Sequence, residues 1–307
     1  MIAFLQEGTT VSLLAATLRV ATPLLLAGLG ALIANRAGVV NLGIEGIMLC
    51  SALAGVVISA YTQSATLGLA GAVLIGGLLG FALAGAFYVL KADLILSGVA
   101  LNLGASAGTI MCLYWLTGDK GISSSLHSKV LPNLDIPLLD RIPFVSQVLS
   151  GQNLMTYVAV LAVPATAFML TRTTFGLRLR AVGQDAHAAA SSGIRVGVIH
   201  LLALGLSGAF SGLAGAYLSM GYVSWFAANM SAGRGFIALA AQVMGGSSAY
   251  GTAAASLLLG AAEALSIRFQ NVGVPNELVQ MVPYVVPVIA LALYGRRVRR
   301  RVAARAD

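Results

Sequence analysis

Charge is what this sequence has least of. Only 9% of its 307 residues are charged, and three of these are lysines, whereas roughly 25% of the residues of a soluble domain are charged. Hydrophobic residues make up 58% of the chain, and the mean hydropathy is +0.91. A chain of this composition cannot cover itself with the polar surface of a soluble protein. We therefore expect an integral membrane protein.

Motifs for nucleotide and metal chemistry are also missing. The sequence contains neither the phosphate-binding pattern GxxxxGK[ST] nor the zinc pattern HExxH. Residues 104–108 (GASAG) fit GxSxG, but they lie inside an apolar run, so we interpret Ser106 as a packing residue. The two cysteines, Cys50 and Cys112, lack CxxC spacing, which disfavours metal or disulfide roles. A transporter of this composition must take its energy from a partner or from an ion gradient.

Long apolar runs dominate what is present. Each membrane-spanning helix needs about 20 apolar residues, so the chain predicts an all-α polytopic transmembrane bundle of about nine (eight to ten) spans in one domain, 1–307. An alternative for the first run is an interfacial helix up to Arg19 followed by a short span. The expected spans are 9–34, 41–60, 65–90, 96–117, 153–171, 197–222, 234–249, 252–270 and 279–295.

The basic residues predict the orientation. Six arginines fall within 296–307, directly after the last run, which is typical of a cytoplasmic tail beside anionic lipid and gives no reason to expect nucleic acid as a partner. With nine spans, the arginine-rich loop 172–196 lies on the same cytoplasmic side as this C-terminus. The polar segment 118–152, poorer in basic residues, becomes an external loop. The N-terminus shows no cleavable signal and is expected to be retained.

The polar stretch 171–193 contains a candidate docking helix. Asp185 can cap the helix N-terminus, the alanine-rich run 186–190 favours helix, and Gly193 can end it in a left-handed conformation. A short helix between two spans could receive force from a partner. The alternative is an ordinary basic loop.

Four polar residues fall inside apolar runs, namely Asn41, Glu45, Asn102 and Glu263. Such residues are costly in a bilayer and face a cavity or a partner group. Neighbouring glycines would permit a broken helix near Asn41 and Glu45. These groups either hydrogen-bond a polar solute or lock helix packing. We favour a solute for the first three, and for Glu263, five positions before Arg268, the two interpretations are equal.

Glycines four residues apart recur in two of the runs, and this spacing predicts that helices approach closely there. The pairs are Gly76 with Gly80, and Gly208 with Gly212. A faint internal repeat relates Arg36–Met48 to Arg234–Met244, as in transporters built from two halves with interrupted helices.

With these stretches in view, the chain resembles permease subunits of ATP-binding cassette importers, in the group that serves simple sugars, branched-chain amino acids and nucleosides. It most resembles the nucleoside branch. Gln184 replaces an expected acidic residue, Ala186 an expected proline, and 246–251 lacks the tryptophan–proline element often found there. The stretches that carry the resemblance are 35–49, 97–105, 175–194, 206–216, 234–246 and 281–291.

The resemblance implies a nucleoside or nucleobase importer in the bacterial cytoplasmic (inner) membrane. Its partners would be a double-cassette ATPase that binds the ATP, a second permease subunit and a lipoprotein-type substrate-binding protein. Import of simple sugars or branched-chain amino acids is the alternative, and an ion-coupled secondary transporter is a different class. The residues implied in ATPase coupling are Arg178, Arg180, Val182, Gly183, Gln184, Asp185, Ala189 and Gly193.

Overall fold

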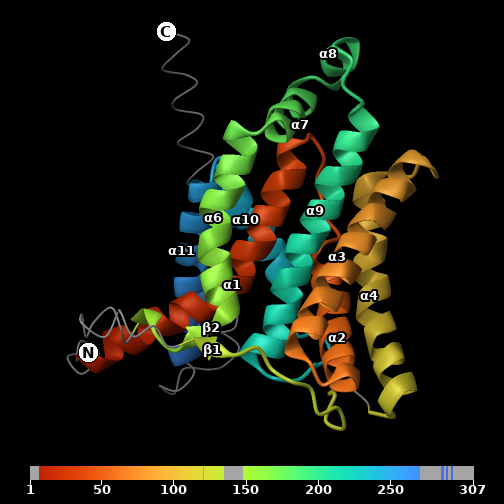
Figure 1. The fold of residues 1–307 in the computed structure, drawn as a ribbon. Coiled ribbons are helices and arrows are strands. Elements are labelled where there is room, and N and C mark those ends of the chain that lie inside the picture. Colours follow the sequence, from red (N-terminus) through yellow and green to blue (C-terminus); the bar gives the residue numbers. More distant parts are fainter. Residues whose placement is uncertain are drawn as a thin grey trace.

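The computed structural model describes residues 7–119, 121–134 and 148–269, together with 285, 286, 288, 289 and 292. Within them the chain is a bundle of long helices with one small pair of antiparallel strands (Figure 1). The elements are α1 (Glu7–Arg36), α2 (Ile44–Thr62), α3 (Ala65–Tyr88), α4 (Leu94–Thr117), β1 (Asn133–Leu134), β2 (Gln152–Asn153), α6 (Leu154–Arg172), α7 (Thr174–Gln184), α8 (Ala186–Ser191), α9 (Val196–Tyr217) with its π-helical end η3 (Leu218–Tyr222), α10 (Arg234–Met244) and α11 (Ala249–Phe269).

The expected polytopic helical bundle is confirmed, but a count of about nine spans is not. In the described residues, seven helices are long and apolar enough to cross a membrane. The run 234–249 was expected to be a span, yet its helix α10 has only 11 residues and ends at Met244. Gly245 and Gly246 follow at once, and Gly246 has a positive φ of 61°, which turns the chain. The run 279–295 and the basic tail 296–307 lie largely or wholly outside the described residues.

The first apolar run forms one continuous helix, and whether its part up to Arg19 lies at the membrane interface stays open. Helix α1 continues through Arg19 and Pro23 to Arg36. The guanidinium of Arg19 donates to Gln152 Oε1 over 3.0 Å, which gives this donor a partner within the protein. The N-terminal part of α1 lies obliquely to the rest of the bundle (Figure 1). A proline inside the helix removes one backbone donor and permits such a bend.

Polar residues at the ends of the apolar runs determine where helices begin. Asp93, Asn153 and Thr173 each accept a hydrogen bond from a backbone N–H in the first turn of α4, α6 and α7. These are the N-cap interactions that short polar side chains provide. The sequence therefore encodes both the spans and the short links between them.

Helices α3 and α9 pack through their glycines, as the four-residue spacing predicts. A Cβ added at Gly76 would lie 2.4 Å from the carbonyl oxygen of Gly208, and one at Gly80 would lie 2.2 Å from that of Leu204. Real Cβ atoms do not approach backbone so closely, so these backbones are in contact because side chains are absent. Helix α9 also packs against α1 and α2, which places it at the centre of the bundle.

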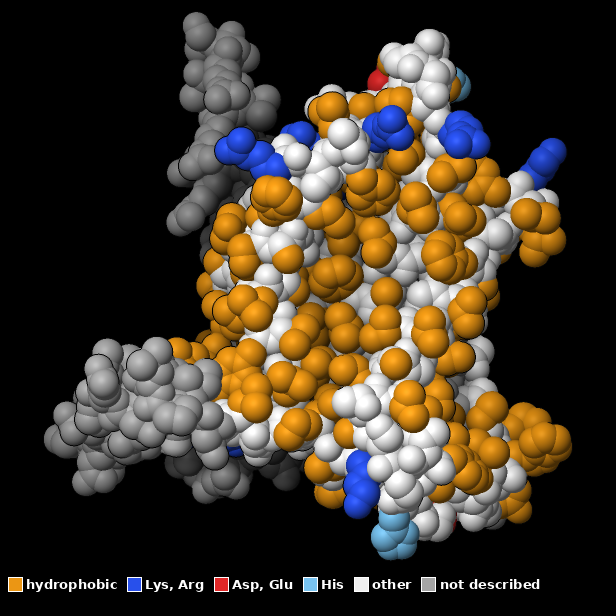
Figure 2. Space-filling view, viewed as in Figure 1, with side chains coloured by type: hydrophobic (Ala, Val, Ile, Leu, Met, Phe, Trp, Pro, Cys, Tyr) orange, Lys and Arg blue, Asp and Glu red, His pale blue; other side chains and the backbone are white. Residues whose placement is uncertain are grey.

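The two extramembrane regions lie at opposite ends of the bundle. Helices α7 and α8 and the turn between α3 and α4 lie at one end, and the described parts of 118–152 lie at the other (Figure 1). Lys and Arg side chains gather at the α7–α8 end, above a broad band of hydrophobic side chains (Figure 2). Under the positive-inside rule, this gathering of basic residues predicts that the α7–α8 end faces the cytoplasm.

We expect Gly80→Ala to destabilise the bundle by about 1–3 kcal/mol, because the new methyl group would force α3 and α9 apart. Thermal unfolding of the purified protein in detergent would measure this. Gly85→Ala, on the same helix, is the matched control, since nothing lies within 4 Å of an added Cβ there. Equal unfolding temperatures for the two variants would contradict the close contact.

Candidate functional site

A break in the helical structure separates α1 from α2. Residues 37–43 are not helical, and α2 begins only at Ile44. Gly38 has a φ of +83°, a conformation that side chains disfavour, so a glycine is required at this corner. The glycines were expected to permit a broken helix near Asn41 and Glu45; the structure has a non-helical link at 37–43, and α2 is continuous from Ile44.

Two asparagines satisfy the backbone groups exposed by this break. Asn41 accepts a hydrogen bond from the Gly43 N–H over 3.0 Å and donates to the hydroxyl of Ser207 on α9, also over 3.0 Å. Asn102 of α4 accepts from the Gly46 N–H and donates to the Leu42 carbonyl, both over 2.8 Å. Together they attach the start of α2 to α9 on one side and to α4 on the other.

Glu45 joins the start of α2 to the start of α10. Its Oε1 accepts from the Gly233 N–H and its Oε2 from the Gly235 N–H, each over 2.7 Å. A carboxylate at the N-terminus of a helix is favoured by the unpaired N–H groups and by the helix dipole. A Cβ at Gly235 would lie 2.7 Å from the Glu45 backbone nitrogen, so glycine is needed for this approach.

This junction lies deep in the bundle. Helix α10 leads from Glu45 toward Ser247, whose carbonyl accepts from Arg36 Nε over 2.7 Å at the end of α1. Its 11 residues extend about 16 Å along the helix axis. Because the hydrocarbon core of a bilayer is about 30 Å thick, we infer that Glu45 would lie near the middle of a bilayer whose surface is at the Arg36 end of the bundle.

Glu263 of α11 forms an ion pair with Arg234, at the first residue of α10. Its Oε1 is 2.7 Å from Arg234 Nη2 and also accepts from Nε over 3.1 Å. Arg234 Nη1 donates to the Met230 carbonyl over 3.0 Å. This is the only ion pair within the described part of the chain. The partner of Glu263 is therefore Arg234 and not Arg268, which donates to Ser12.

All four predicted polar residues are thus linked through the start of α2 and the start of α10. Their described bonds are to protein groups, which matches the interpretation that they lock helix packing. Contact with a solute stays a prediction for each of them. The sequence analysis missed Gly233, Gly235 and Arg234. A glycine on either side of an arginine at the start of an apolar run was the available signal for a helix that begins inside the membrane.

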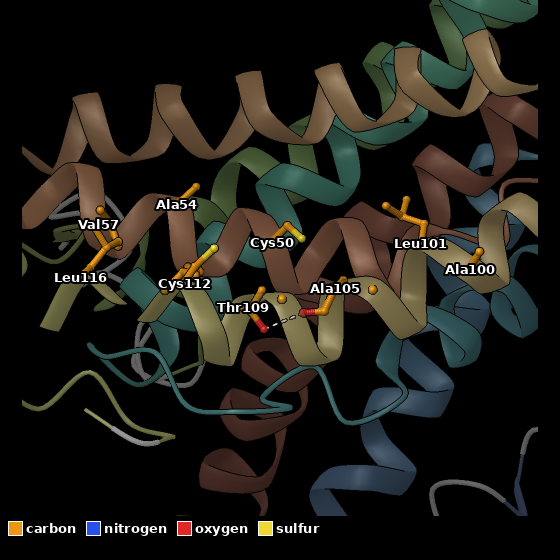
Figure 3. Close-up of a pocket in the computed structure, with 12 residues that line it drawn as sticks. Cys50, Ala54, Val57, Ala100, Leu101, Ala105, Thr109, Cys112 and Leu116 are labelled. Atoms are coloured by element: carbon orange, nitrogen blue, oxygen red, sulfur yellow. Dashed lines mark hydrogen bonds between the residues drawn. The ribbon is translucent and has the colours of Figure 1, made fainter. Parts of the chain in front are cut away.

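An apolar cleft of about 540 Å³ lies beside this junction, between α2 and α4 (Figure 3). Cys50, Ala54 and Val57 of α2 face Ala105 and Cys112 of α4 across it. Its lining threonine, Thr109, donates to the Ala105 carbonyl over 2.7 Å and so offers no free donor. The volume would suit a small molecule, but the lining suits an apolar group and gives a polar solute nothing to bind.

The short helix predicted around Asp185 is present as α8, and its docking role stays a prediction. Asp185 Oδ1 accepts from the N–H groups of His187 and Ala188 over 2.9 and 3.0 Å. Gly193 has a φ of +80°, and the chain turns there toward α9. The six-residue helix lies farthest from the bundle at its end of the molecule (Figure 1).

The cap favours the ionised form of Asp185. The N–H groups of Ala188 and His187 hold the pKa of Asp185 below its ordinary value. A carboxyl whose pKa is lowered by folding contributes stability above its unfolded pKa, which is about 3.9, and loses that contribution as the pH falls through the lowered value. The cap is therefore intact at neutral pH.

A second helix, α7, precedes α8, and the sequence analysis did not separate the two. Its buried residues Gly176, Leu179 and Val182 recur every three positions, as in an amphipathic helix. Helix α7 contacts the corner between α1 and α2, because a Cβ at Gly183 would lie 2.2 Å from the Arg36 carbonyl oxygen. The docking region is a pair of helices packed onto the break.

The residues expected to couple to an ATPase fall into two groups. Val182 and Ala189 are buried and hold α7 and α8 in place. The second group is exposed and forms the outer surface of α7, α8 and the turn after α8. Arg180 belongs to neither group, because it is half-buried and lines a cavity with Arg36 and Arg172. The exposed ones are Arg178, Gly183, Gln184, Asp185 and Gly193.

We expect Asn102→Ala to lower the stability of the protein by about 1–3 kcal/mol, because the Gly46 N–H and the Leu42 carbonyl would lose their partners. Ser106→Ala on the same helix is the control, since Ser106 bonds only to the carbonyl of Leu103 in its own helix. Thermal unfolding in detergent measures both. An unfolding temperature unchanged by Asn102→Ala would show that this side chain does not hold the break.

Comparisons with known proteins agree with this architecture. A family model described as branched-chain amino acid transport system / permease component matches residues 13–291. The putative glucose ABC transporter permease protein TsgC13 of Haloferax volcanii is 36% identical over 84% of this chain and 78% of its own length. The nucleoside ABC transporter permease protein NupC of Lactococcus lactis is 32% identical over 89% of both chains. The guanosine ABC transporter permease protein NupQ of Bacillus subtilis is 34% identical over 90% of this chain and 89% of its own length.

No solved structure gives a significant match to the chain. The family model nevertheless covers almost the whole sequence, and it includes the break at 37–43, the docking helices and the start of α10. The chain therefore belongs to the permease component family of branched-chain amino acid transport systems, a family of multi-pass membrane proteins of ABC transporters.

Proposed function

We propose that this chain is a permease subunit that imports nucleosides or related nucleobases. The observation that carries the substrate class is the similarity to NupC and NupQ along about nine-tenths of each chain. That similarity spans the mid-membrane junction of α2 and α10. The similarity to the glucose permease TsgC13 makes simple sugars the alternative that an experiment must exclude.

The proposed importer needs several subunits. We infer a double-cassette ATPase, a second permease and a lipoprotein-type binding protein, assembled in the bacterial inner membrane with the α7–α8 end and the C-terminus in the cytoplasm. The exposure of helix α4 is the observation that supports a second permease subunit. Only 22% of its apolar window is buried, against 83% for α1. Its exposed face carries Leu103, Met111 and Trp115 and adjoins the apolar cleft, so a neighbouring helix would cover apolar surface there.

The docking helices connect the ATPase to the transport pathway in this proposal. Force on α8 passes to α7, and Gly183 of α7 touches the corner at Arg36 and Gly38. That corner leads through 39–43 to Glu45, where α2 and α10 meet. A displacement of α7 would therefore move the one place where both broken helices begin, which suits alternating access.

Uptake tests the substrate class. The chain is expressed with its ATPase, second permease and binding protein in a strain without nucleoside uptake, and labelled guanosine, uridine, ribose, glucose and leucine are supplied separately. We expect uptake of the nucleosides, abolished when the ATPase carries an inactive cassette. Uptake of glucose or leucine alone would overturn the substrate class. Nucleoside uptake that survives the inactive cassette would indicate ion coupling.

We expect Asp185→Ala to lower nucleoside uptake several-fold while the membrane bundle stays folded, because loss of an N-cap costs about 0.5–2 kcal/mol of helix stability. Uptake and ATP hydrolysis by the purified complex are the measurements. Asp185→Asn is the matched control, since asparagine caps as well as aspartate without the charge. If the alanine variant couples hydrolysis to uptake as the natural protein does, α8 does not transmit force.

A further inference from the structure

A cavity of about 470 Å³ opens at the end of the bundle that carries α7 and α8. Three arginines from three different helices line it: Arg36 at the end of α1, Arg172 at the end of α6 and Arg180 on α7. Figure 2 shows that Lys and Arg side chains gather at this end, at the border of the hydrophobic band. A cavity at this level of a membrane protein meets lipid headgroups.

Among the residues that the structure describes, the charges in this cavity have no partner of opposite sign. No Asp or Glu is among the residues that line it, and the ion pair found in the described chain is elsewhere, between Arg234 and Glu263. The Nε of Arg180 is buried without a hydrogen-bond partner. An arginine with an unsatisfied buried donor is costly, and its planar guanidinium is suited to phosphate. The cavity therefore fits an anion.

An apolar groove of about 370 Å³ continues from the cavity into the membrane region. Pro164 of α6 and Tyr250 of α11 line both spaces, so the two are adjacent. Val160, Leu161 and Leu257 line the groove and are 51%, 68% and 39% exposed. From Pro164 to Thr156 the groove follows α6 for about 12 Å, at 1.5 Å per residue. A site with a basic end and an apolar extension matches an amphipathic ligand.

We propose that this is a binding site for an anionic phospholipid, with its phosphate among Arg172, Arg180 and Arg36 and one acyl chain in the groove between α6 and α11. Basic pockets between helices on the cytoplasmic side bind acidic headgroups in this way. A free phosphate would leave the exposed apolar groove uncovered, and an acidic protein surface would not reach between the helices. The proposal does not depend on which solute is transported.

The site has a consequence for the docking region. Arg180 belongs to α7, whereas Arg36 and Arg172 end α1 and α6. A lipid phosphate held among the three would fix α7 to the ends of two membrane helices. Arg178, two positions away, lines a separate cavity with Arg195, because residues two apart in a helix point to different faces. The two arginines of α7 thus have different surroundings.

Native mass spectrometry of the purified full-length chain, titrated with phosphatidylglycerol or phosphatidylcholine, tests the proposal. We expect retention of phosphatidylglycerol in preference to phosphatidylcholine. Arg172→Gln/Arg180→Gln should weaken phosphatidylglycerol binding more than tenfold, since each arginine near a lipid surface contributes about 1 kcal/mol, or about fivefold. Arg178→Gln/Arg195→Gln removes the same charge outside the cavity and should leave binding unchanged. Thermal unfolding confirms that each variant is folded.

A second pair of variants tests the acyl-chain groove. Val160→Trp should fill the groove and reduce phosphatidylglycerol retention at least several-fold, whereas Leu201→Trp, at an exposed position of α9, should not. Equal retention of both lipids by the natural chain, or unchanged binding by Arg172→Gln/Arg180→Gln, would overturn the proposal. If inorganic phosphate displaced the lipid and Val160→Trp did not change phosphatidylglycerol retention, the cavity would be an anion site without an acyl-chain groove. Loss of ATPase copurification with unchanged lipid binding would assign the arginines to protein docking instead.

Discussion

The carboxylate of Glu45 is the group on which the interior of this permease depends. Helices that begin inside a bilayer expose backbone N–H groups where no water can satisfy them. Glu45 accepts from two such groups at the start of α10, while its own helix is held by Asn102. One acidic side chain thereby stabilises a helix start on another segment, 188 positions along the chain. Without this junction, neither break could remain in the membrane.

Glycine provides the second constraint, because it lets backbone approach backbone. Gly76 and Gly80 bring α3 against α9, and Gly235 brings α10 against Glu45. The same residue type serves two purposes here: close packing of continuous helices and access of a carboxylate to a helix end. Apolar burial drives neither contact in lipid, where van der Waals packing and hydrogen bonds must hold helices together.

Local features could be predicted from the sequence, and features that join distant segments could not. Asp185, Gly193 and the break near Asn41 follow from caps and glycines within a few residues, and the structure confirms them. The run 234–249 was wrongly expected to be a full span. Its composition is apolar throughout, and composition cannot show that a helix begins part of the way across the bundle. The partner of Glu263 lies 29 positions away, whereas sequence proximity pointed to Arg268. The hydrogen-bond partners of the four polar residues required the fold, and their contact with a solute stays a prediction.

The corner at Arg36 and Gly38 connects these parts into one mechanical unit. Gly183 of α7 packs on its backbone, His200 of α9 bonds to the Ala37 carbonyl over 2.9 Å, and Arg36 itself donates to Ser247 beyond α10. Two helices, α7 and α9, and the link between α10 and α11 therefore contact the few residues that lead into the break. In the proposed mechanism, a movement of α7 would act on this corner and through it on α9, on the link after α10 and on the start of α2. The corner would thus connect the short helix at the end of the bundle with the junction at Glu45, about one length of α10, or about 16 Å, away.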